Sequence, residues 1–169
     1  MVSLATHVRT RLLAACLVIV AGCGDDPAGP GQATIPDIVG TYSGTWQTRV
    51  TAVATGAELL VLCPGSVIIA EQEADGGFTG FWTQIGTTEC TAAAGSLTGD
   101  VAAGGALTIP EFANASGQTL EESSGCTSVT GDDAYTGTAD GTRFDISRTV
   151  TADCRGTELT IAWKLSAAR

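Results

Sequence analysis

Residues 157–165 read TELTIAWKL, a stretch in which apolar and polar side chains alternate. One face carries the apolar side chains Leu159, Ile161, Trp163 and Leu165, and the other face carries charged and hydroxyl side chains. An alternation with a period of two is typical of a β-strand that is buried on one face and solvated on the other. The stretch therefore predicts an all-β fold in which each strand turns one of its faces toward the core.

The same alternation recurs along the chain in the direction of the N-terminus. Strand-like segments are separated by turns such as Ala103-Gly104-Gly105, and eight are predicted: 41–50, 67–73, 78–85, 96–102, 106–112, 127–138, 143–154 and 157–165. The segment 67–74 also fits a short helix capped by Ser66, but its β-branched start, Val67-Ile68-Ile69, favours a strand.

Eight antiparallel strands joined by short turns bury their apolar faces in a sandwich or in a closed barrel. Only closure removes the exposed strand edges. We therefore predict an antiparallel up-and-down β-barrel of about eight strands, formed as one domain by residues 37–169. A β-sandwich, or a barrel with an extra strand at 58–62, is the alternative.

The N-terminal region has the parts of an export signal. Arg9 and Arg11 precede an apolar run at 12–20, which is shorter than the ~20 residues of a membrane-spanning helix and matches the core of a signal peptide. The run ends in Val20-Ala21-Gly22-Cys23, which resembles the lipobox of bacterial lipoproteins. The resemblance implies that residues 1–22 are a signal peptide and that lipidated Cys23 holds the mature chain on a membrane.

The segment after the cysteine predicts a tether. Residues 23–36 contain three prolines and no apolar periodicity, which is typical of a flexible linker. In the sorting of such lipoproteins an Asp directly after the Cys favours the inner membrane, and Gly24 occupies that place here. The resemblance therefore implies a location at the outer membrane, facing the periplasm or the cell exterior.

The charge of the mature chain excludes some functions. Without the signal peptide, 6 basic residues remain against 18 acidic residues, a net charge of −12. Binding to nucleic acid depends mainly on Lys and Arg at phosphates, so no nucleic-acid partner is expected. The only histidine, His7, lies in the signal peptide. A mature chain without histidine has no Ser-His-Asp or Cys-His machinery and no imidazole metal ligand, so we expect neither an enzyme nor a cofactor.

Four cysteines remain for disulfides, because Cys16 is removed with the signal peptide and Cys23 is lipidated. Asp75-Gly76-Gly77 lies midway between Cys63 and Cys90, and Asp140-Gly141 lies midway between Cys126 and Cys154. Residues equidistant from a hairpin turn face each other, so we predict the bridges Cys63–Cys90 and Cys126–Cys154. A site for Zn²⁺ on these cysteines is disfavoured because they lack CxxC spacing.

Gly44-Thr45-Trp46 in the first predicted strand resembles the Gly-x-Trp of calycins, the lipocalin and avidin group. The resemblance implies an eight-stranded barrel with a tryptophan at one end and a small apolar or amphipathic ligand in its mouth. The side chains that we expect to line such a site are Tyr42, Trp46, Trp82, Arg148 and Trp163. The alternative is a barrel whose tryptophans are its core and which acts as a structural or interaction module of the envelope.

Arg148 is the one charge on an otherwise apolar face, between Ile146 and Val150. We expect it to point inward and to be paired with a carboxylate, a backbone carbonyl or the ring of Trp46, since a buried guanidinium needs a partner. It serves either as a structural clamp or as the anchor for an anionic ligand head group.

Close carboxylate pairs are the remaining candidates for chemistry. Glu71 and Glu73 share a strand face, which a carboxylate-based hydrolase would need. A solvent-facing strand edge explains the pair equally simply. Asp132, Asp133 and Asp140 suit calcium by ligand type but lack the spacing of known calcium loops, so no metal site is predicted.

Overall fold

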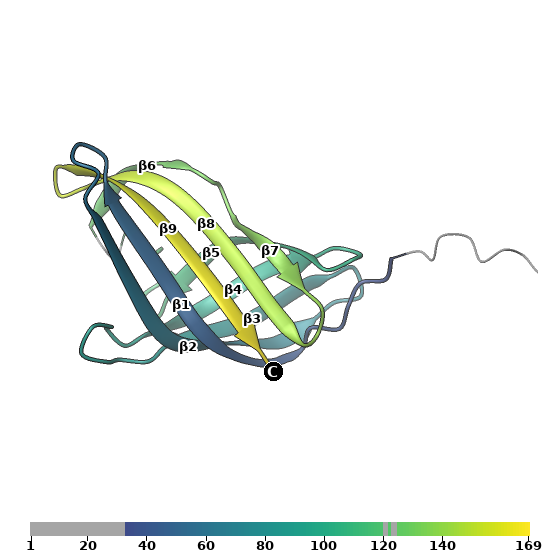
Figure 1. The fold of residues 1–169 in the computed structure, drawn as a ribbon. Helices are drawn as coiled ribbons and strands as arrows, with labels where there is room; N and C mark the ends of the chain where they lie inside the picture. The colour runs from purple at the N-terminus through teal and green to yellow at the C-terminus, as the bar shows by residue number, and fades with distance from the viewer. Residues whose placement is uncertain (1–32, 120–121, 123–124) are drawn as a thin grey trace, which may run out of the picture. The chain divides into compact units, whose positions relative to one another are not determined.

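The computed structural model describes residues 33–119, 122 and 125–169. These residues form an all-β domain (Figure 1), and they include no helix long and apolar enough to cross a membrane. The strands are β1 (Gly40–Ala52), β2 (Glu58–Gln72), β3 (Gly77–Gln84), β4 (Ala93–Val101), β5 (Ala106–Asn114), β6 (Cys126–Gly131), β7 (Tyr135–Ala139), β8 (Arg143–Cys154) and β9 (Thr157–Ala168).

The strands close into an antiparallel barrel. The hydrogen-bonded order runs from β7 through β5, β4, β3, β2 and β1 to β9, and β9 pairs with β8, which pairs with β7. Eight strands therefore complete the ring, and the sixth strand pairs with β8 beyond the end of β7. The predicted up-and-down barrel is confirmed, and the sandwich alternative is wrong because the sheet closes on itself.

Two strand boundaries differ from the prediction. The segments 58–62 and 67–73 are halves of one 15-residue strand, β2, which continues through Pro64 and Gly65. The segment 127–138, predicted as one strand, is divided into β6 and β7. Ser128 has a φ of 54° and Gly131 a φ of 120°, and residues 132–134 lie outside both strands. The bulge at 128–129 shifts the register against β8, and the pairing resumes at Thr130 and Gly131 before β6 ends.

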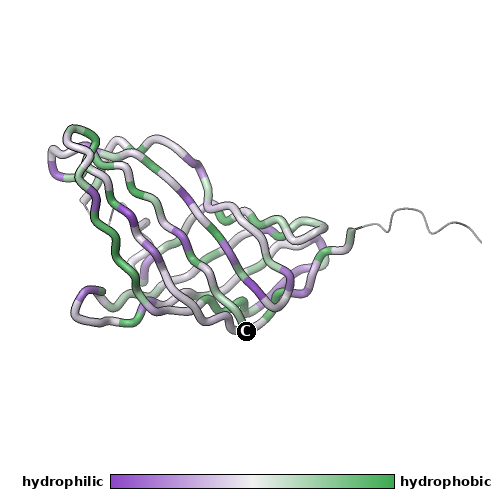
Figure 2. Tube along the Cα trace, in the orientation of Figure 1, coloured by the Kyte–Doolittle hydropathy of each residue, from purple (hydrophilic) through white to green (hydrophobic). Residues whose placement is uncertain are grey.

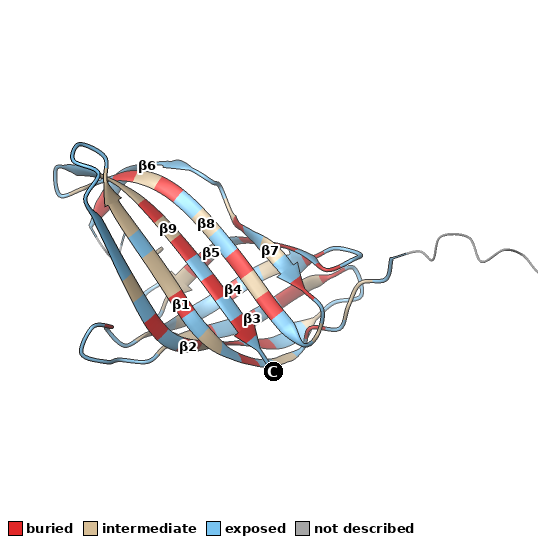
Figure 3. Cartoon of the chain, in the orientation of Figure 1, coloured by how far each residue is buried: buried red, intermediate tan, exposed pale blue. Residues whose placement is uncertain are grey.

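The core fills the inside of the barrel by simple alternation along each strand. In β8 the buried residues are Phe144, Ile146, Val150 and Ala152, with exposed or half-buried residues between them. Figure 3 shows the resulting bands of buried and exposed residues across β8 and β9. The buried set includes every tryptophan and both tyrosines of the chain.

The residues before β1 lie across one end of the barrel. The Ile38 backbone N–H donates to Gln72 Oε1 at 2.8 Å, and Gln72 Nε2 donates to the Pro36 carbonyl at 2.9 Å. Farther back, the Gly104 N–H donates to the Thr34 carbonyl at 3.1 Å. The last residues of the segment expected to be a tether thus contact the barrel, and buried Ile38 closes this end of the core.

Both predicted disulfides are confirmed. Cys63–Cys90 joins β2 to the loop between β3 and β4, and Cys126–Cys154 joins directly opposed residues of β6 and β8. Cys126 and Cys154 face each other because the bulge shifts the register between β6 and β8. Cys90 lies beyond the last residue of β3 that pairs with β2, so the loop after β3 brings it to Cys63.

Candidate functional site

Four of the five residues predicted to bind a ligand lie in the core. Tyr42, Trp46, Trp82 and Trp163 are at most 8% exposed. Two rings that were not predicted, Phe112 and Tyr135, connect the tryptophans. The ring-centroid distances are 6.0 Å for Trp46–Trp82, 5.4 Å for Trp46–Phe112, 4.6 Å for Phe112–Tyr135 and 6.2 Å for Tyr135–Trp163. Edge-on contacts of this kind stabilise a core beyond the area that they bury.

The polar atoms of three of these rings bind the protein's own backbone. Trp46 Nε1 donates to the Thr83 carbonyl and Trp82 Nε1 to the Ala113 carbonyl, each at 3.1 Å. The Tyr42 hydroxyl donates to the Ile38 carbonyl at 2.9 Å. The two tryptophan bonds join residues more than 30 positions apart in the sequence, and the tyrosine bond joins β1 to the segment just before it. These donors therefore hold the barrel together.

Inward-facing glycines accommodate the large rings. A Cβ added at Gly65 would lie 2.7 Å from Trp46 Cδ1, and one at Gly95 would lie 2.7 Å from Trp82 Nε1. At Gly99 the nearest ring atom, Phe78 Cζ, would be 2.8 Å away. Contacts below 3.0 Å require a displacement, so the rings occupy the space beside these glycines. A glycine-rich interior is thus filled by aromatic side chains of neighbouring strands.

Arg148, the fifth predicted residue, is half-buried on the same face of β8 as Ile146 and Val150. Its Nε donates to the Asp132 carbonyl at 2.9 Å, and its guanidinium carbon lies 5.3 Å from the centre of the Tyr135 ring. Of the partners considered from the sequence, a backbone carbonyl is present, while the aromatic partner is Tyr135 in place of Trp46. These contacts join β8 to the bend that separates β6 from β7.

A second arginine contacts an aromatic ring and was not predicted. The guanidinium carbon of Arg169 lies 5.2 Å from the centre of the Tyr42 ring, and the side chain donates to the Val39 carbonyl. Its backbone N–H donates to the Thr142 carbonyl at 3.0 Å. Sequence alternation could not identify it, because the residue follows the last strand.

An apolar surface, interrupted by the hydroxyls of Ser66 and Thr83, lies on the outside of the barrel. It is formed by six exposed residues of β2, β3 and the residue after β3, and we call it the β2–β3 face: Leu60, Leu62, Pro64, Ile68, Phe81 and Ile85. Leu62, Phe81 and Ile85 are each more than half exposed. The first half of β2 is hydrophobic in Figure 2 and exposed in Figure 3.

A shallow hollow adjoins this face. It has a volume of about 490 Å³, and Phe81 forms one of its walls. The other lining residues come from β3, β4 and the start of the loop after β5, and they include Thr83, Ala94, Ser96 and Asn114. Its walls carry no charged side chain among the lining residues, so it suits an apolar group.

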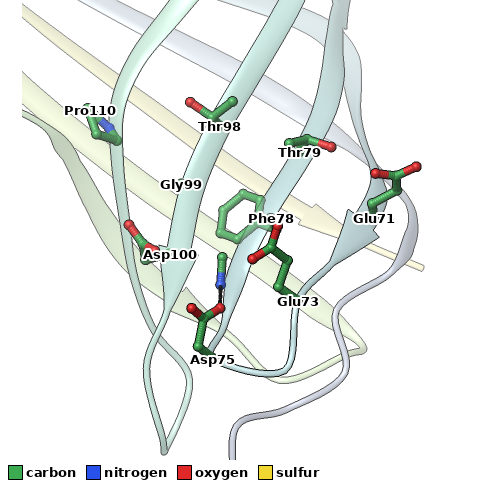
Figure 4. Close-up of a pocket in the computed structure, with 10 residues that line it drawn as sticks. Glu71, Glu73, Asp75, Phe78, Thr79, Thr98, Gly99, Asp100 and Pro110 are labelled. Atoms are coloured by element: carbon green, nitrogen blue, oxygen red, sulfur yellow. Dashed lines mark hydrogen bonds between the residues drawn. The ribbon is translucent and has the colours of Figure 1, made fainter.

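The carboxylates Glu71 and Glu73 line a different hollow, of about 370 Å³, together with Asp75 and Asp100 (Figure 4). All four residues are exposed, and the Gly77 N–H donates to Asp75 Oδ1 at 3.2 Å. In the part of the chain that the structure describes, no three His, Cys, Asp or Glu side chains are grouped to hold a metal ion. The hollow is an acidic surface beside the turn between β2 and β3.

Two of the three aspartates considered for calcium accept hydrogen bonds from the protein itself. Asp132 Oδ2 accepts the Thr149 N–H at 2.8 Å. Asp140 Oδ1 accepts the Thr142 hydroxyl at 2.7 Å, the Thr142 N–H at 2.9 Å and the Arg143 N–H at 2.8 Å. The Thr142 bonds, with smaller effects of Arg143, lower the pKa of Asp140 below its ordinary value of 3.8. Asp140 supports the turn before β8, and Asp132 attaches the segment between β6 and β7 to β8.

Comparisons with known proteins give no family. No protein-family model matches the chain, and no curated protein does. The fold defines the chain as a closed eight-stranded antiparallel barrel, an architecture compatible with that of calycins. The predicted signal peptide, the predicted lipidation site Cys23 and most of the predicted tether lie outside the described residues.

Proposed function

We propose that this chain is a lipid-anchored protein of the cell envelope whose barrel works through its outer surface, as a structural or interaction module. The single observation that carries the second half of the proposal is the contact of Trp46, Trp82, Phe112, Tyr135 and Trp163 with one another. A barrel that uses these rings as its core does not offer them to a ligand.

The lipobox-like Val20-Ala21-Gly22-Cys23 supports the anchor. The proposal holds that residues 1–22 are removed, that acyl chains on Cys23 insert into the membrane and that the outer membrane is the destination. One acyl chain alone binds marginally, so two or three are needed for stable attachment. The proposal includes no catalytic step and no cofactor.

Metabolic labelling with a palmitate analogue tests the anchor. The wild-type chain should be labelled and should fractionate with membranes, and Cys23→Ser should lose the label and leave residues 1–22 attached. Cys16→Ser, which changes a cysteine inside the signal peptide, is the matched control and should remain labelled. Label that survives Cys23→Ser would refute the lipoprotein proposal.

Native mass spectrometry of the full chain, extracted from membranes, tests the solid core. We expect the mass of the mature polypeptide plus its acyl chains, with no other bound molecule. The alternative function, binding of a small apolar or amphipathic ligand in the barrel, predicts an additional mass present in one copy. Such a mass, lost in Trp46→Ala but retained in a control such as Ser43→Ala, would overturn the proposal.

A further inference from the structure

The β2–β3 face differs from the rest of the barrel in charge. Central outward positions on four adjacent strands are uncharged: 41, 43, 45 and 47 on β1, 62, 64, 66 and 68 on β2, 81 and 83 on β3, and 94 and 96 on β4. The charged outward residues of these strands lie nearer the strand ends, and two of them, Arg49 and Glu58, form an ion pair of 3.6 Å beside Leu60. The outward positions of β8 and β9 include Asp145, Asp153, Glu158 and Lys164. In a chain with a net charge of −10, a surface free of carboxylates is a local exception.

Its polar side chains are partly satisfied within the face. The hydroxyls of Ser66 and Thr83 hydrogen-bond to each other at 2.8 Å, between Ile68 and Phe81 on one side and Pro64 and Ile85 on the other. Each hydroxyl of this pair therefore keeps one hydrogen-bond partner when the face is covered. The face can be buried without the desolvation cost that charged groups impose.

The size of the face suits a protein contact. Leu60, Leu62, Ile68, Phe81 and Ile85 are between 36% and 58% exposed. Half-exposed side chains of this size leave apolar surface on the order of 400–500 Å², as large as the functional patches of monomeric proteins. With the hydroxyl and alanine positions at its margins, the face approaches the ~800 Å² that each partner contributes to an interface of standard size.

Its shape is complementary to itself. Phe81, 56% exposed, projects directly beside the apolar hollow of about 490 Å³ that it helps to line. A projecting ring and a hollow that adjoin on one surface are what a two-fold axis needs, because each copy then places its ring against the hollow of the other. Two such sheet faces pack at a separation of about 10 Å.

We propose that two copies of this chain associate through the β2–β3 face, with the two-fold axis near Phe81. The absence of charge around Phe81, at the centre of the contact, allows two acidic chains to meet there without opposing carboxylates. This inference rests on the proposed function, since it names a partner for the outer surface. If the two-fold axis is parallel to the barrel axes, the barrel ends that carry Ile38 lie on the same side of the dimer. Both N-terminal anchors can then insert into one membrane.

Photo-crosslinking in the membranes where the full chain is made tests the contact. p-Benzoylphenylalanine introduced at Phe81 should give a product of twice the protomer mass that contains peptides of this chain alone. The same group at Lys164, on the opposite wall, should not. Crosslinks from Phe81 only to lipid or to a different protein would overturn the inference.

Sedimentation velocity of the full chain in density-matched detergent supplies the second measurement. Wild type should dimerise at micromolar concentration, and Phe81→Asp or Leu62→Asp should raise the dimer dissociation constant at least tenfold. Ser147→Asp adds the same charge on the opposite wall and should leave the dimer dissociation constant unchanged. Phe81→Ser removes the ring without adding a charge and should also raise the dissociation constant. A wild-type chain that is monomeric throughout would refute self-association. A failure of the proposed function appears separately, as a co-purified small molecule.

Discussion

At the scale of single residues, glycines decide how the barrel is filled. The composition alone, with 22 glycines, left open whether the interior was roomy or packed. The structure answers the question at Gly65 and Gly95, whose missing side chains are replaced by the indoles of Trp46 and Trp82. The filling of space beside a glycine by a ring from a neighbouring strand cannot be predicted from the sequence. It depends on the register of the strands, which brings the glycine beside the ring.

Gly65→Ala should therefore destabilise the protein. The new methyl group would meet the Thr83 carbonyl and Trp46 Cδ1, and overpacking of this kind costs about 1–3 kcal/mol. Equilibrium denaturation followed by tryptophan fluorescence measures the change. Ser43→Ala, at an exposed position of β1, is the control and should stay within about 0.5 kcal/mol of wild type. Full stability of Gly65→Ala would reveal free space beside Trp46 and would favour a ligand.

Arg148→Met tests whether Arg148 is a clamp. The variant loses the hydrogen bond to the Asp132 carbonyl and the stacking on Tyr135, and a loss of about 1–3 kcal/mol is expected. Arg143→Met provides the control, because the Arg143 side chain is 71% exposed and 4.0 Å from its acidic neighbour, Asp145. Equal unfolding midpoints for the two variants would mean that Arg148 contributes no more than a surface charge.

At the scale of elements, alternation predicted the strands well where one face is buried throughout. For β8 and β9 the predicted inward residues Phe144, Ile146, Ile161 and Leu165 are buried. The prediction of one strand over 127–138 failed because a bulge at Ser128, which has a positive φ, shifts the register and residues 132–134 lie outside both strands. A serine does not indicate a bulge by residue type alone. The ligand site was predicted from the same aromatic residues that form the core, since both uses require inward-facing rings.

The turn between β7 and β8 should carry a measurable pH dependence. Three hydrogen bonds stabilise the ionised Asp140 carboxylate and lower its pKa below 3.8. Because the pKa is lower in the folded state, this stabilisation is present above the unfolded pKa and is lost as the pH falls through the folded pKa. A carboxyl-detected NMR titration should find the lowered value. Asp140→Asn should flatten the stability profile in acid, and Asp133→Asn should not; identical profiles would refute the assignment.

At the scale of the whole molecule, closure and cross-linking are separate sources of stability. The eight-stranded ring closes through the pairing of β1 with β9, of β9 with β8 and of β8 with β7. None of these pairings uses β6. The sixth strand is attached along β8, and Cys126–Cys154 ties its first residue to that strand.

Removal of the Cys126–Cys154 bridge should therefore loosen β6 and leave the ring intact. The bridge has a sequence separation of 28 residues, for which the chain-entropy estimate is about 3.5 kcal/mol, an upper value if the unfolded chain keeps some structure. In the double variant Cys126→Ser/Cys154→Ser, hydrogen exchange should accelerate over β6 while β1, β8 and β9 stay protected. Cys63→Ser/Cys90→Ser is the matched control, because it frees the loop between β3 and β4 and should leave β6 protected. Exchange that accelerates equally in every strand of the first variant would show that the barrel depends on the bridge for closure.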